Sequence, residues 1–459
     1  MPRMTEGAAG SLFTLDPGRA YPVLDRADGI HVWDRDGRKL LDAIAGIAVA
    51  NIGYGRQEVV DAIAEQAARL PYAVGNIFAS QPAIDLAAAI ARVTPGDLDS
   101  VHFTSGGSEA VEVALKIARH THVIRGEPER SVFISRWTNY HGATIGGLTV
   151  GGSRLRRRVY EPLLQQTPHI RTPYEYRCPW PDAHPACAEP AAAELEEAIL
   201  AAGPGRVAAF IAEPIVASVG GAIRPPDAYW PRIREICDRY GVLLIADEIV
   251  TGFGRTGRDF AMQHWGVVPD LLVMGKGVSG GYAPLGAVAV RRAIRATFED
   301  TGTPFEHIFT FGGHPVACTA GLAVLRIWER EHLTQRAGSL EGAFRAALER
   351  LREHPFVGDI RVSGLMAGIE FVADRDTKEP FEPALKVGAR VREAGLRNGI
   401  VTYPGSGMAD GLRGDVISLY PPLIVSDAHV AEIAERLDAT FAEVGNELDA
   451  VAPARRAGA

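Results

Sequence analysis

Short apolar runs alternate with amphipathic segments through the middle of the chain, and this alternation is the strongest constraint on its fold. Short apolar strands that are separated by helices pack as a largely parallel sheet with helices on both faces. We therefore predict an α/β fold with a mostly parallel central sheet. The runs lie at 101–103, 132–134, 207–212, 242–246, 271–273 and 287–290.

The two ends of the chain have a different pattern. A hairpin is predicted at 31–41, where Asp36-Gly37 supplies the turn. The part after about residue 329 contains a long helix, strand-like pieces around 361–372 and 416–419, and a final helix that starts at Ser426.

The chain has 459 residues, which is longer than chains that fold around a single hydrophobic core usually are, so two structural units are expected. We expect residues 71–329 to form the large domain. Residues 1–70 and 330–459 are expected to form together a smaller α+β domain.

Composition narrows the choice of partners and location. Apolar residues make up 47% and charged residues 23%, a balance typical of soluble globular proteins. The net charge of −8 predicts no nucleic-acid surface, and the arginine run at 154–158 is expected to be a solvated loop or a helix start, with phosphate recognition as the alternative. No apolar run is long enough to cross a bilayer, and residues 1–13 contain no signal-length apolar stretch. We expect a cytoplasmic protein without membrane contact.

The four cysteines, Cys178, Cys187, Cys237 and Cys318, are widely spaced, as is usual for reduced thiols in a reducing compartment. Cys178 and Cys187 bracket His184 in a proline-rich loop, where a metal ion could bind. Their spacing matches no common zinc pattern, so no metal site is predicted.

The segment 104–109 (TSGGSE) follows one predicted strand and opens a helix. Its glycines allow a ligand to approach the backbone closely, and the helix N-terminus offers unpaired N–H groups and a positive dipole end. This pattern favours a phosphate site at Gly107 and Ser108. The alternative is a simple turn in which Ser108 caps the helix.

Two charged residues follow two other predicted strands. Asp247 comes directly after the run 242–246, and Lys276 lies between glycines after the run 271–273. Ligands of α/β sheets bind at the carboxyl ends of strands. There a buried carboxylate needs a cationic partner, such as a protonated pyridine nitrogen, and a desolvated lysine becomes a nucleophile. The alternatives are a capping aspartate and a solvated lysine.

Tyr140, His141 and Glu213 also follow predicted strands. The Tyr140 ring could stack over a flat cofactor, and the Glu213 carboxylate would lie at the ligand edge of the sheet. The alternatives are an aromatic core residue, a hydrogen-bonded structural histidine and a structural glutamate.

Residues 252–257 (GFGRTG) formally match the dinucleotide-binding pattern G-x-G-x-x-G. That fingerprint needs its first glycine at a strand-to-helix turn, whereas residues 247–251 intervene here and no strong helical pattern follows. We interpret the match as a false positive, which leaves a nicotinamide dehydrogenase as a remote alternative.

A phosphate cradle, a ring-stacking aromatic, a pyridinium partner and a nucleophilic lysine follow one another along the chain, and pyridoxal phosphate (PLP) needs all four. On these residues the chain resembles the class III aminotransferases, which are fold type I PLP enzymes, over nearly its whole length. The matching motifs are SGGSEA at 105–110, YHG at 140–142, AEP at 212–214, DEIVTGFGRTG at 247–257, KG at 276–277 with GG at 280–281, and TFGGHP at 310–315.

The resemblance implies a role for each site residue. Lys276 would form the Schiff base with PLP and shuttle the proton, and Asp247 would pair with the pyridine nitrogen. The other implied cofactor residues are Gly107 and Ser108 at the phosphate, Tyr140 and Ile249 on the two ring faces, His141 and Glu213 near the ring, and Thr310.

Thr310 in such families reaches the phosphate of the neighbouring subunit. The resemblance therefore implies a homodimer with its active site at the interface, alone or within a higher oligomer.

The segment 173–179 (PYEYRCP) resembles a loop of family members that use pyruvate with ω-amino acids, taurine or simple amines. Phe78 is expected to line the pocket, although a core role fits it equally, and Arg413 is expected to pair with a substrate carboxylate. The expected reaction is ping-pong transfer of an amino group from an amine or ω-amino acid to a 2-oxo acid, with pyruvate as the acceptor.

Two further alternatives stay open at this point. One is another PLP reaction on the same scaffold, such as that of an aminomutase, racemase or decarboxylase. The other is a non-catalytic interaction protein, which the presence of both Lys276 and Asp247 disfavours.

Overall fold

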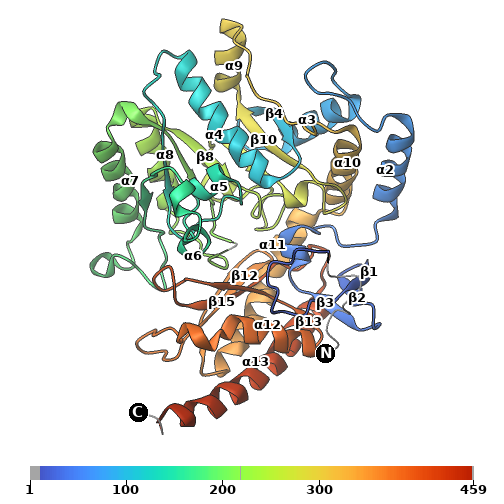
Figure 1. The fold of residues 1–459 in the computed structure, drawn as a ribbon, viewed down its shortest axis with the longest axis vertical. Helices are drawn as coiled ribbons and strands as arrows, with labels where there is room; N and C mark the ends of the chain where they lie inside the picture. The colour runs from blue at the N-terminus through green and yellow to red at the C-terminus, as the bar shows by residue number, and fades with distance from the viewer. Residues whose placement is uncertain (1–10, 218, 457–459) are drawn as a thin grey trace.

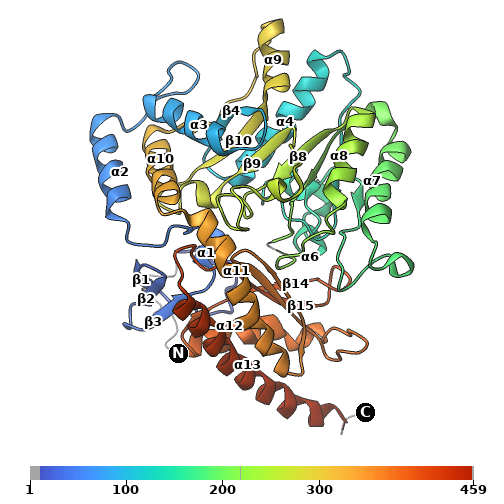
Figure 2. The same cartoon turned by 180° about the vertical axis from the view of Figure 1, so that it is seen from behind.

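The computed structural model describes residues 11–217 and 219–456 and has two lobes (Figure 1). The larger lobe is built around a seven-stranded sheet, and the smaller lobe contains two four-stranded sheets. Both ends of the described chain lie at the smaller lobe (Figures 1 and 2). No helix in this part of the chain has both the length and the apolar character needed to span a bilayer.

The sheet of the large lobe is mostly parallel, as predicted, and each of the six apolar runs falls on one of its strands to within one residue. The exception is β10, which is antiparallel to both of its neighbours. Only residues 275–285 connect it to the preceding strand β9, and they contain no α-helix for a parallel crossover. Across the sheet the strands are β4 (Leu98–Thr104), β10 (Gly286–Arg291), β9 (Leu271–Met274), β8 (Leu243–Asp247), β7 (Val207–Ala212), β5 (Val132–Arg136) and β6 (His169–Ile170).

Helices cover both faces of this sheet, so its central strands are buried throughout (Figures 1 and 2). Alternate residues of a strand point to opposite faces. In β8, Ile245 packs in the same cluster as α4 (Gly107–Ile124), whereas Leu244 packs with α8 (Tyr229–Tyr240). Burial on both faces explains why these strands are continuous apolar runs.

The small lobe combines the two ends of the chain. The predicted hairpin is present, and its strand β3 (Lys39–Asp42) pairs in parallel with β13 (Ile400–Val401). The predicted long helix is α11 (Leu333–Glu349), and the final helix is α13 (Asp427–Arg456). The other small-lobe elements are β1 (Leu24–Asp28), β2 (His31–Asp34), β11 (Val357–Ser363), β12 (Met366–Phe371), β14 (Tyr403–Ser406), β15 (Asp415–Leu419) and α12 (Val387–Arg397). The remaining α-helices are α1 (Ala45–Ala48), α2 (Gln57–Arg69), α3 (Gln81–Val93), α5 (Ile145–Val150), α6 (Arg154–Arg157), α7 (Ala188–Ala202), α9 (Arg292–Thr301) and α10 (Pro315–Arg330).

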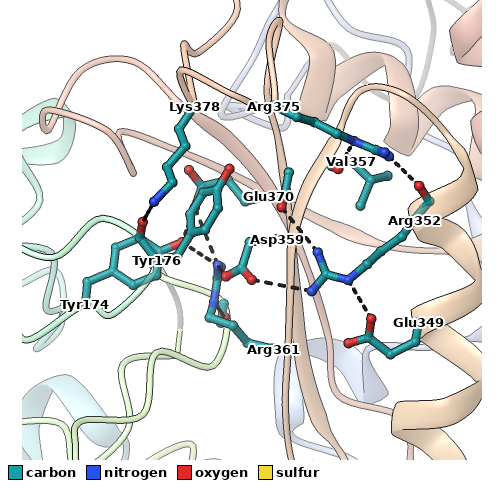
Figure 3. Close-up of polar contacts among 12 residues, drawn as sticks. Tyr174, Tyr176, Glu349, Arg352, Val357, Asp359, Arg361, Glu370, Arg375 and Lys378 are labelled. Carbon is teal, nitrogen blue, oxygen red and sulfur yellow. Dashed lines mark hydrogen bonds and ion pairs between the residues drawn. The ribbon is translucent and has the colours of Figure 1, made fainter. Parts of the chain in front are cut away.

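A buried network of charged and phenolic groups joins the two lobes (Figure 3). Glu370 of β12 is fully buried, and its Oε1 accepts a hydrogen bond of 2.6 Å from Nε of Arg177 in the large lobe. Its Oε2 accepts a hydrogen bond from the Tyr174 hydroxyl and lies 3.5 Å from Nη1 of Arg361. The Arg361 side chain also donates 2.8 Å to the carbonyl of Gly221. The Glu370 carboxylate therefore binds side chains of both lobes and links the two.

Replacing Glu370 by alanine is expected to lower the free energy of unfolding by about 3–5 kcal/mol, because it removes the carboxylate that pairs with the half-buried Arg177, while Arg361 keeps its ion pair with Asp359. Urea denaturation of the purified variant measures this change. Glu349→Ala is the matched control: its pair with Arg352 is 40% exposed on both sides, so the expected loss is about 1 kcal/mol or less. Equal losses in the two variants would contradict the role of the buried network.

The expectation that the four cysteines lie apart from one another is wrong for one pair. The Sγ atoms of Cys178 and Cys187 are in direct contact, although the two residues are nine positions apart in the sequence. A short turn at Pro181–Ala183 folds this loop back on itself, which sequence spacing alone did not indicate. Cys237 and Cys318 are buried and unbridged, as expected.

Candidate active site

The polar residues predicted at strand ends meet at one edge of the large sheet. Asp247 is the last residue of β8, and β8 pairs with β9, after which Lys276 follows Gly275. Glu213 directly follows β7, and Tyr140 follows β5 after a short loop. Because these strands are parallel neighbours, their carboxyl ends lie side by side, which is where α/β sheets bind ligands.

Backbone packing brings Lys276 close to the start of α4. A Cβ atom on Gly275 would lie 3.4 Å from both the Cα of Gly107 and Cγ2 of Ile249. A Cβ atom on Gly107 would lie only 2.7 Å from Cδ1 of Ile249, so a larger residue would collide there. The helix start, the loop after β8 and the loop after β9 therefore converge at one point.

The amine of Lys276 is held in an enclosed position that disfavours its charge. Burial lowers the pKa of Lys276 to about 8, while the carboxylates of Asp247 and Glu213 act in the opposite direction. The backbone of Lys276 has φ 47°, a left-handed conformation that is uncommon for a residue with a side chain. Such perturbed groups are typical of functional sites.

Asp247 is buried and fixed in orientation. Its Oδ2 lies 2.7 Å from Nδ1 of His141, and its Oδ1 accepts a hydrogen bond of 3.1 Å from the backbone N–H of Ile249. Within the described residues, no lysine or arginine forms an ion pair with Asp247, and Nε2 of His141 is buried without a hydrogen-bond partner. The site therefore contains a buried carboxylate that can accept a further cationic group.

Glu213 connects the loop of Tyr140 to the sheet. Its two carboxylate oxygens accept hydrogen bonds from the backbone N–H groups of Tyr140, at 2.9 Å, and Ala217, at 3.0 Å. Burial, together with the charge of Asp247, raises the pKa of Glu213 to about 6. The Glu213 carboxylate therefore holds the segment that carries the Tyr140 ring by binding the backbone of that segment.

The N-terminus of α4 has the features of an anion site. Its cap residue is Gly106, which has no side chain to pair with the first N–H groups of the helix. Ser108 lies inside the helix rather than at the cap, and its Oγ accepts a hydrogen bond of 3.1 Å from the N–H of Ala143. The first turn of α4 thus faces the loop that carries Tyr140 and His141.

Two predicted site residues lie elsewhere on the same chain. Thr310 is exposed, and its carbonyl accepts a hydrogen bond of 3.0 Å from the Tyr72 hydroxyl. Phe78 is 63% exposed and lines a surface cavity together with Ile308 and Gly312. The segments that carry Phe78 and Thr310 are therefore neighbours on one surface.

Arg413 is engaged by acidic side chains. Its Nε donates 2.8 Å to Asp410, and its Nη1 donates 2.9 Å to Glu379. Both pairs are solvent-accessible and are weak by the usual measure of surface ion pairs. In this conformation the Arg413 guanidinium is paired with both carboxylates, and little free energy is needed to separate them.

The expectation of a solvated arginine run is wrong for Arg157, whereas Arg156 is exposed but contacts Tyr140. The guanidinium of Arg156 lies over the Tyr140 ring, 4.5 Å from its centroid, and donates 3.2 Å to the Tyr403 hydroxyl. Arg157 is buried and donates 2.7 Å to the carbonyl of Leu148. The alternative of a helix start is correct, since residues 154–157 form α6. Sequence reasoning missed Arg156 as a neighbour of Tyr140, because a charge run does not reveal which of its members contact other parts of the chain.

The segment 252–257 forms a series of turns, with Phe253, Gly254 and Gly257 at positive φ. No α-helix follows it, as the false-positive interpretation requires; the next element is a 3₁₀ turn at Ala261–Trp265. Arg255 is fully buried and donates 3.0 Å to the carbonyl of Leu365 in the small lobe. This segment therefore connects the lobes.

Comparison with known proteins gives the family. The model of the class III aminotransferases matches residues 16–441. The putrescine–pyruvate aminotransferase of Pseudomonas aeruginosa is 38% identical over 415 residues, which are 90% of this chain and 88% of that protein. An uncharacterised aminotransferase of Bacillus subtilis, YodT, is 36% identical and covers 94% of this chain and 97% of its own length.

Solved structures agree with this assignment. An amine transaminase from an uncultivated Pseudomonas species, solved in its PLP-bound form, has a TM-score of 0.88 and 37% identity, covering 95% of this chain and 98% of that one. An (S)-enantioselective omega-transaminase from Thermomicrobium roseum has a TM-score of 0.86 and 38% identity, covering 93% of each chain.

The residues present fit PLP. The start of α4 offers N–H groups for a phosphate, the Asp247 carboxylate can take a protonated ring nitrogen, and Lys276 supplies an amine of lowered pKa. Three findings agree: the site residues fit PLP, the family model covers most of the sequence, and the fold is close to those of solved transaminases. The chain belongs to the class III aminotransferases and is a PLP-dependent enzyme that transfers an amino group to a 2-oxo acid.

Proposed function

We propose that this enzyme takes the amino group from an amine or ω-amino acid and passes it to pyruvate. The observation that supports the chemistry is the Lys276 amine, whose pKa burial lowers to about 8 although the Asp247 carboxylate acts in the opposite direction. The substrate class is supported by the putrescine–pyruvate aminotransferase and the amine transaminases to which the chain is similar.

Lys276 and Asp247 carry the proposed reaction. When bound, PLP supplies a protonated aromatic ring that accepts electrons from the bond broken at the substrate carbon. Lys276 Nζ holds the cofactor covalently at rest and, once released, moves the proton during amino transfer. Asp247 keeps the ring nitrogen protonated, and His141 is a positioning residue that fixes the Asp247 carboxylate.

The other proposed contacts bind and orient the cofactor. The backbone of Gly107 and the start of α4 with Ser108 bind the phosphate. Tyr140 and Ile249 pack on the two ring faces. Glu213 acts through the backbone N–H of Tyr140, which it holds at 2.9 Å.

A donor and acceptor screen tests the proposed substrates. Purified holoenzyme is given putrescine, β-alanine, taurine or a simple aryl amine, each with pyruvate or 2-oxoglutarate. We expect pyruvate to be the faster acceptor by about tenfold, which corresponds to about 1.4 kcal/mol in the transition state. Alanine formed in equal amount to donor consumed also separates amino transfer from mutase, racemase or decarboxylase reactions. A strict requirement for 2-oxoglutarate would contradict the proposal.

The lowered pKa of Lys276 predicts how cofactor uptake depends on pH. Only the neutral amine attacks the cofactor, so covalent uptake of PLP by the apoenzyme should rise with pH and level off just above the pKa of about 8. The absorbance of bound cofactor, followed from about pH 6 to about pH 10, measures this rate. Because Asp247 raises the pKa of Lys276, the midpoint should move to lower pH in Asp247→Asn. A midpoint near that of an ordinary lysine would contradict the prediction.

We further propose a homodimer in which Thr310 reaches the phosphate of the partner subunit. Support comes from large apolar side chains that are exposed near Thr310, since such patches usually mark interfaces. They are Tyr72, Ile77, Phe78, Ile84, Ile308 and Phe311.

Phe78 on this surface is proposed to line the substrate pocket, and Arg413 is proposed to take the substrate carboxylate after leaving its acidic partners. A cytoplasmic location is also part of the proposal, supported by the buried unbridged thiols of Cys237 and Cys318.

Thr310→Ala should weaken PLP binding by about tenfold, the loss expected for one hydrogen bond to a charged phosphate, without changing the oligomeric state. Phe311→Asp should instead convert dimers to monomers, because it buries an unpaired charge at the interface. Light scattering and PLP titration measure the two effects. A monomeric wild-type enzyme with full activity would contradict the dimer, and unchanged PLP affinity in Thr310→Ala would contradict the phosphate contact.

A further inference from the structure

The loop between β6 and α7 brings two thiols and an imidazole together. The Sγ atoms of Cys178 and Cys187 are in contact, and Nδ1 of His184 lies 3.9 Å from Sγ of Cys187. The three possible ligand atoms all lie within 4.8 Å of one another. The turn at Pro181–Ala183 reverses the chain and makes this convergence possible.

The backbone spacing at this cluster is too wide for an ordinary disulfide. The Cα atoms of Cys178 and Cys187 are 7.2 Å apart, whereas bridged cysteines usually have Cα atoms about 4.4–6.8 Å apart. A tetrahedral zinc ion lies about 2.3 Å from sulfur and about 2.0 Å from nitrogen, which sets ligand atoms about 3.5–3.8 Å apart. The sulfur-to-nitrogen distance of 3.9 Å between Cys187 and His184 is close to that spacing. The Sγ atoms of Cys178 and Cys187 are closer than it and must move apart when the ion binds.

We propose that Cys178, His184 and Cys187 bind one Zn²⁺ ion. Two thiolates and a neutral imidazole balance the charge of the ion, and binding releases the thiol protons to solvent. Cys187 is the cap residue at the N-terminus of α7, where the helix dipole favours a thiolate. Cys187 is buried, Cys178 is half-buried and His184 is exposed, so the fourth position opens to water.

The other two cysteines provide a contrast within the same chain. Cys237 and Cys318 lie in separate apolar clusters, and burial raises the pKa of each thiol to about 12. Such thiols stay protonated and bind no metal near neutral pH. Zinc binding is therefore confined to the loop between β6 and α7.

The proposed site is structural and lies beside the junction of the lobes. Cys178 directly follows Arg177, whose Nε lies 2.6 Å from the buried Glu370 of the small lobe. A bound ion fixes the end of the loop that carries this contact. We expect zinc to stabilise the folded enzyme and to slow proteolysis of residues 178–187, while leaving the chemistry at Lys276 unchanged.

Metal content tests the proposal without reference to activity. The reduced holoenzyme is incubated with Zn²⁺, desalted and analysed by mass spectrometry of the elements. We expect one zinc per chain in the wild type and in the Cys237→Ala control. In Cys178→Ser and Cys187→Ser we expect less than about a tenth of that amount, and in His184→Ala at least about tenfold weaker binding. Retained PLP absorbance shows that the variants are folded.

Replacement of zinc by Co²⁺ gives a second measurement. Tetrahedral thiolate-bound Co²⁺ absorbs in the red, away from bound PLP, and this band should appear in the wild type and be absent from Cys178→Ser. Wild-type enzyme that takes up no zinc would overturn the proposal. So would equal zinc in the wild type and the cysteine variants, or thiol alkylation showing that Cys178 and Cys187 form a disulfide that persists in the presence of zinc.

Discussion

Lys276→Ala is expected to lower the kcat of amino transfer by at least about 10³-fold, because it removes both the covalent attachment and the group that moves the proton. Lys276 lies two positions after the end of β9 at the ligand edge of the sheet, and its lowered pKa makes the neutral amine available near neutral pH. Added methylamine should restore part of the activity, since a small amine can occupy the vacated space and carry the proton.

Lys116→Ala is the matched control for this experiment. Lys116 is an exposed residue of α4 and lies nine positions after Gly107 at the helix start, so its loss should leave kcat unchanged. Borohydride reduction of the holoenzyme followed by peptide mapping should label Lys276. A label on another lysine, or full activity of Lys276→Ala, would contradict the assignment.

Asp247→Asn is expected to lower kcat by about 10²–10⁴-fold, because the amide keeps the shape of the side chain but loses the charge that keeps the ring nitrogen protonated. The hydrogen bond from the N–H of Ile249 can persist to the amide oxygen, so folding should be little affected. Steady-state kinetics with the best donor and pyruvate give the size of the loss, and thermal unfolding reports on folding.

Glu248→Gln supplies the comparison, since Glu248 is buried beside Asp247 but faces other groups. Its carboxylate accepts backbone hydrogen bonds from Ala261, at 2.9 Å, and Met262, at 2.8 Å, and burial raises its pKa to about 7. The glutamine should lower Tm and change kcat by less than about threefold. If Glu248→Gln lost more activity than Asp247→Asn, the proposed role of Asp247 would be wrong.

The sheet of the large lobe could be predicted because the burial of its strands is visible in short segments of the sequence. Every residue of 207–212 is buried, so burial on both faces leaves a continuous apolar run in the sequence. The direction of β10 could not be predicted from its own residues, since it depends on the connection that precedes it. The two-residue strands β6 and β13 are too short to show any alternation.

The same distinction applies to the active site. Asp247 and Lys276 could be singled out because Asp247 directly follows one apolar run and Lys276 comes shortly after another, and the edge where parallel strands end is fixed by topology. The position of Arg156 over Tyr140 depends on the path of the loop at 151–160, which no periodic pattern describes. The pairing of Glu370 with Arg177 and the contact of Cys178 with Cys187 likewise depend on tertiary structure.

The parallel pairing of β3 with β13 has a consequence for synthesis on the ribosome. All strands of the large sheet lie within residues 98–291, so that sheet can assemble while later parts of the chain are still being translated. The hairpin that contains β3 is made first, yet its outer edge stays unpaired until residues 400–401 emerge. The strand β3, which is synthesised early, therefore completes its pairing only when β13 has been synthesised. Premature termination before residue 400 leaves the outer edge of β3 exposed and open to aggregation.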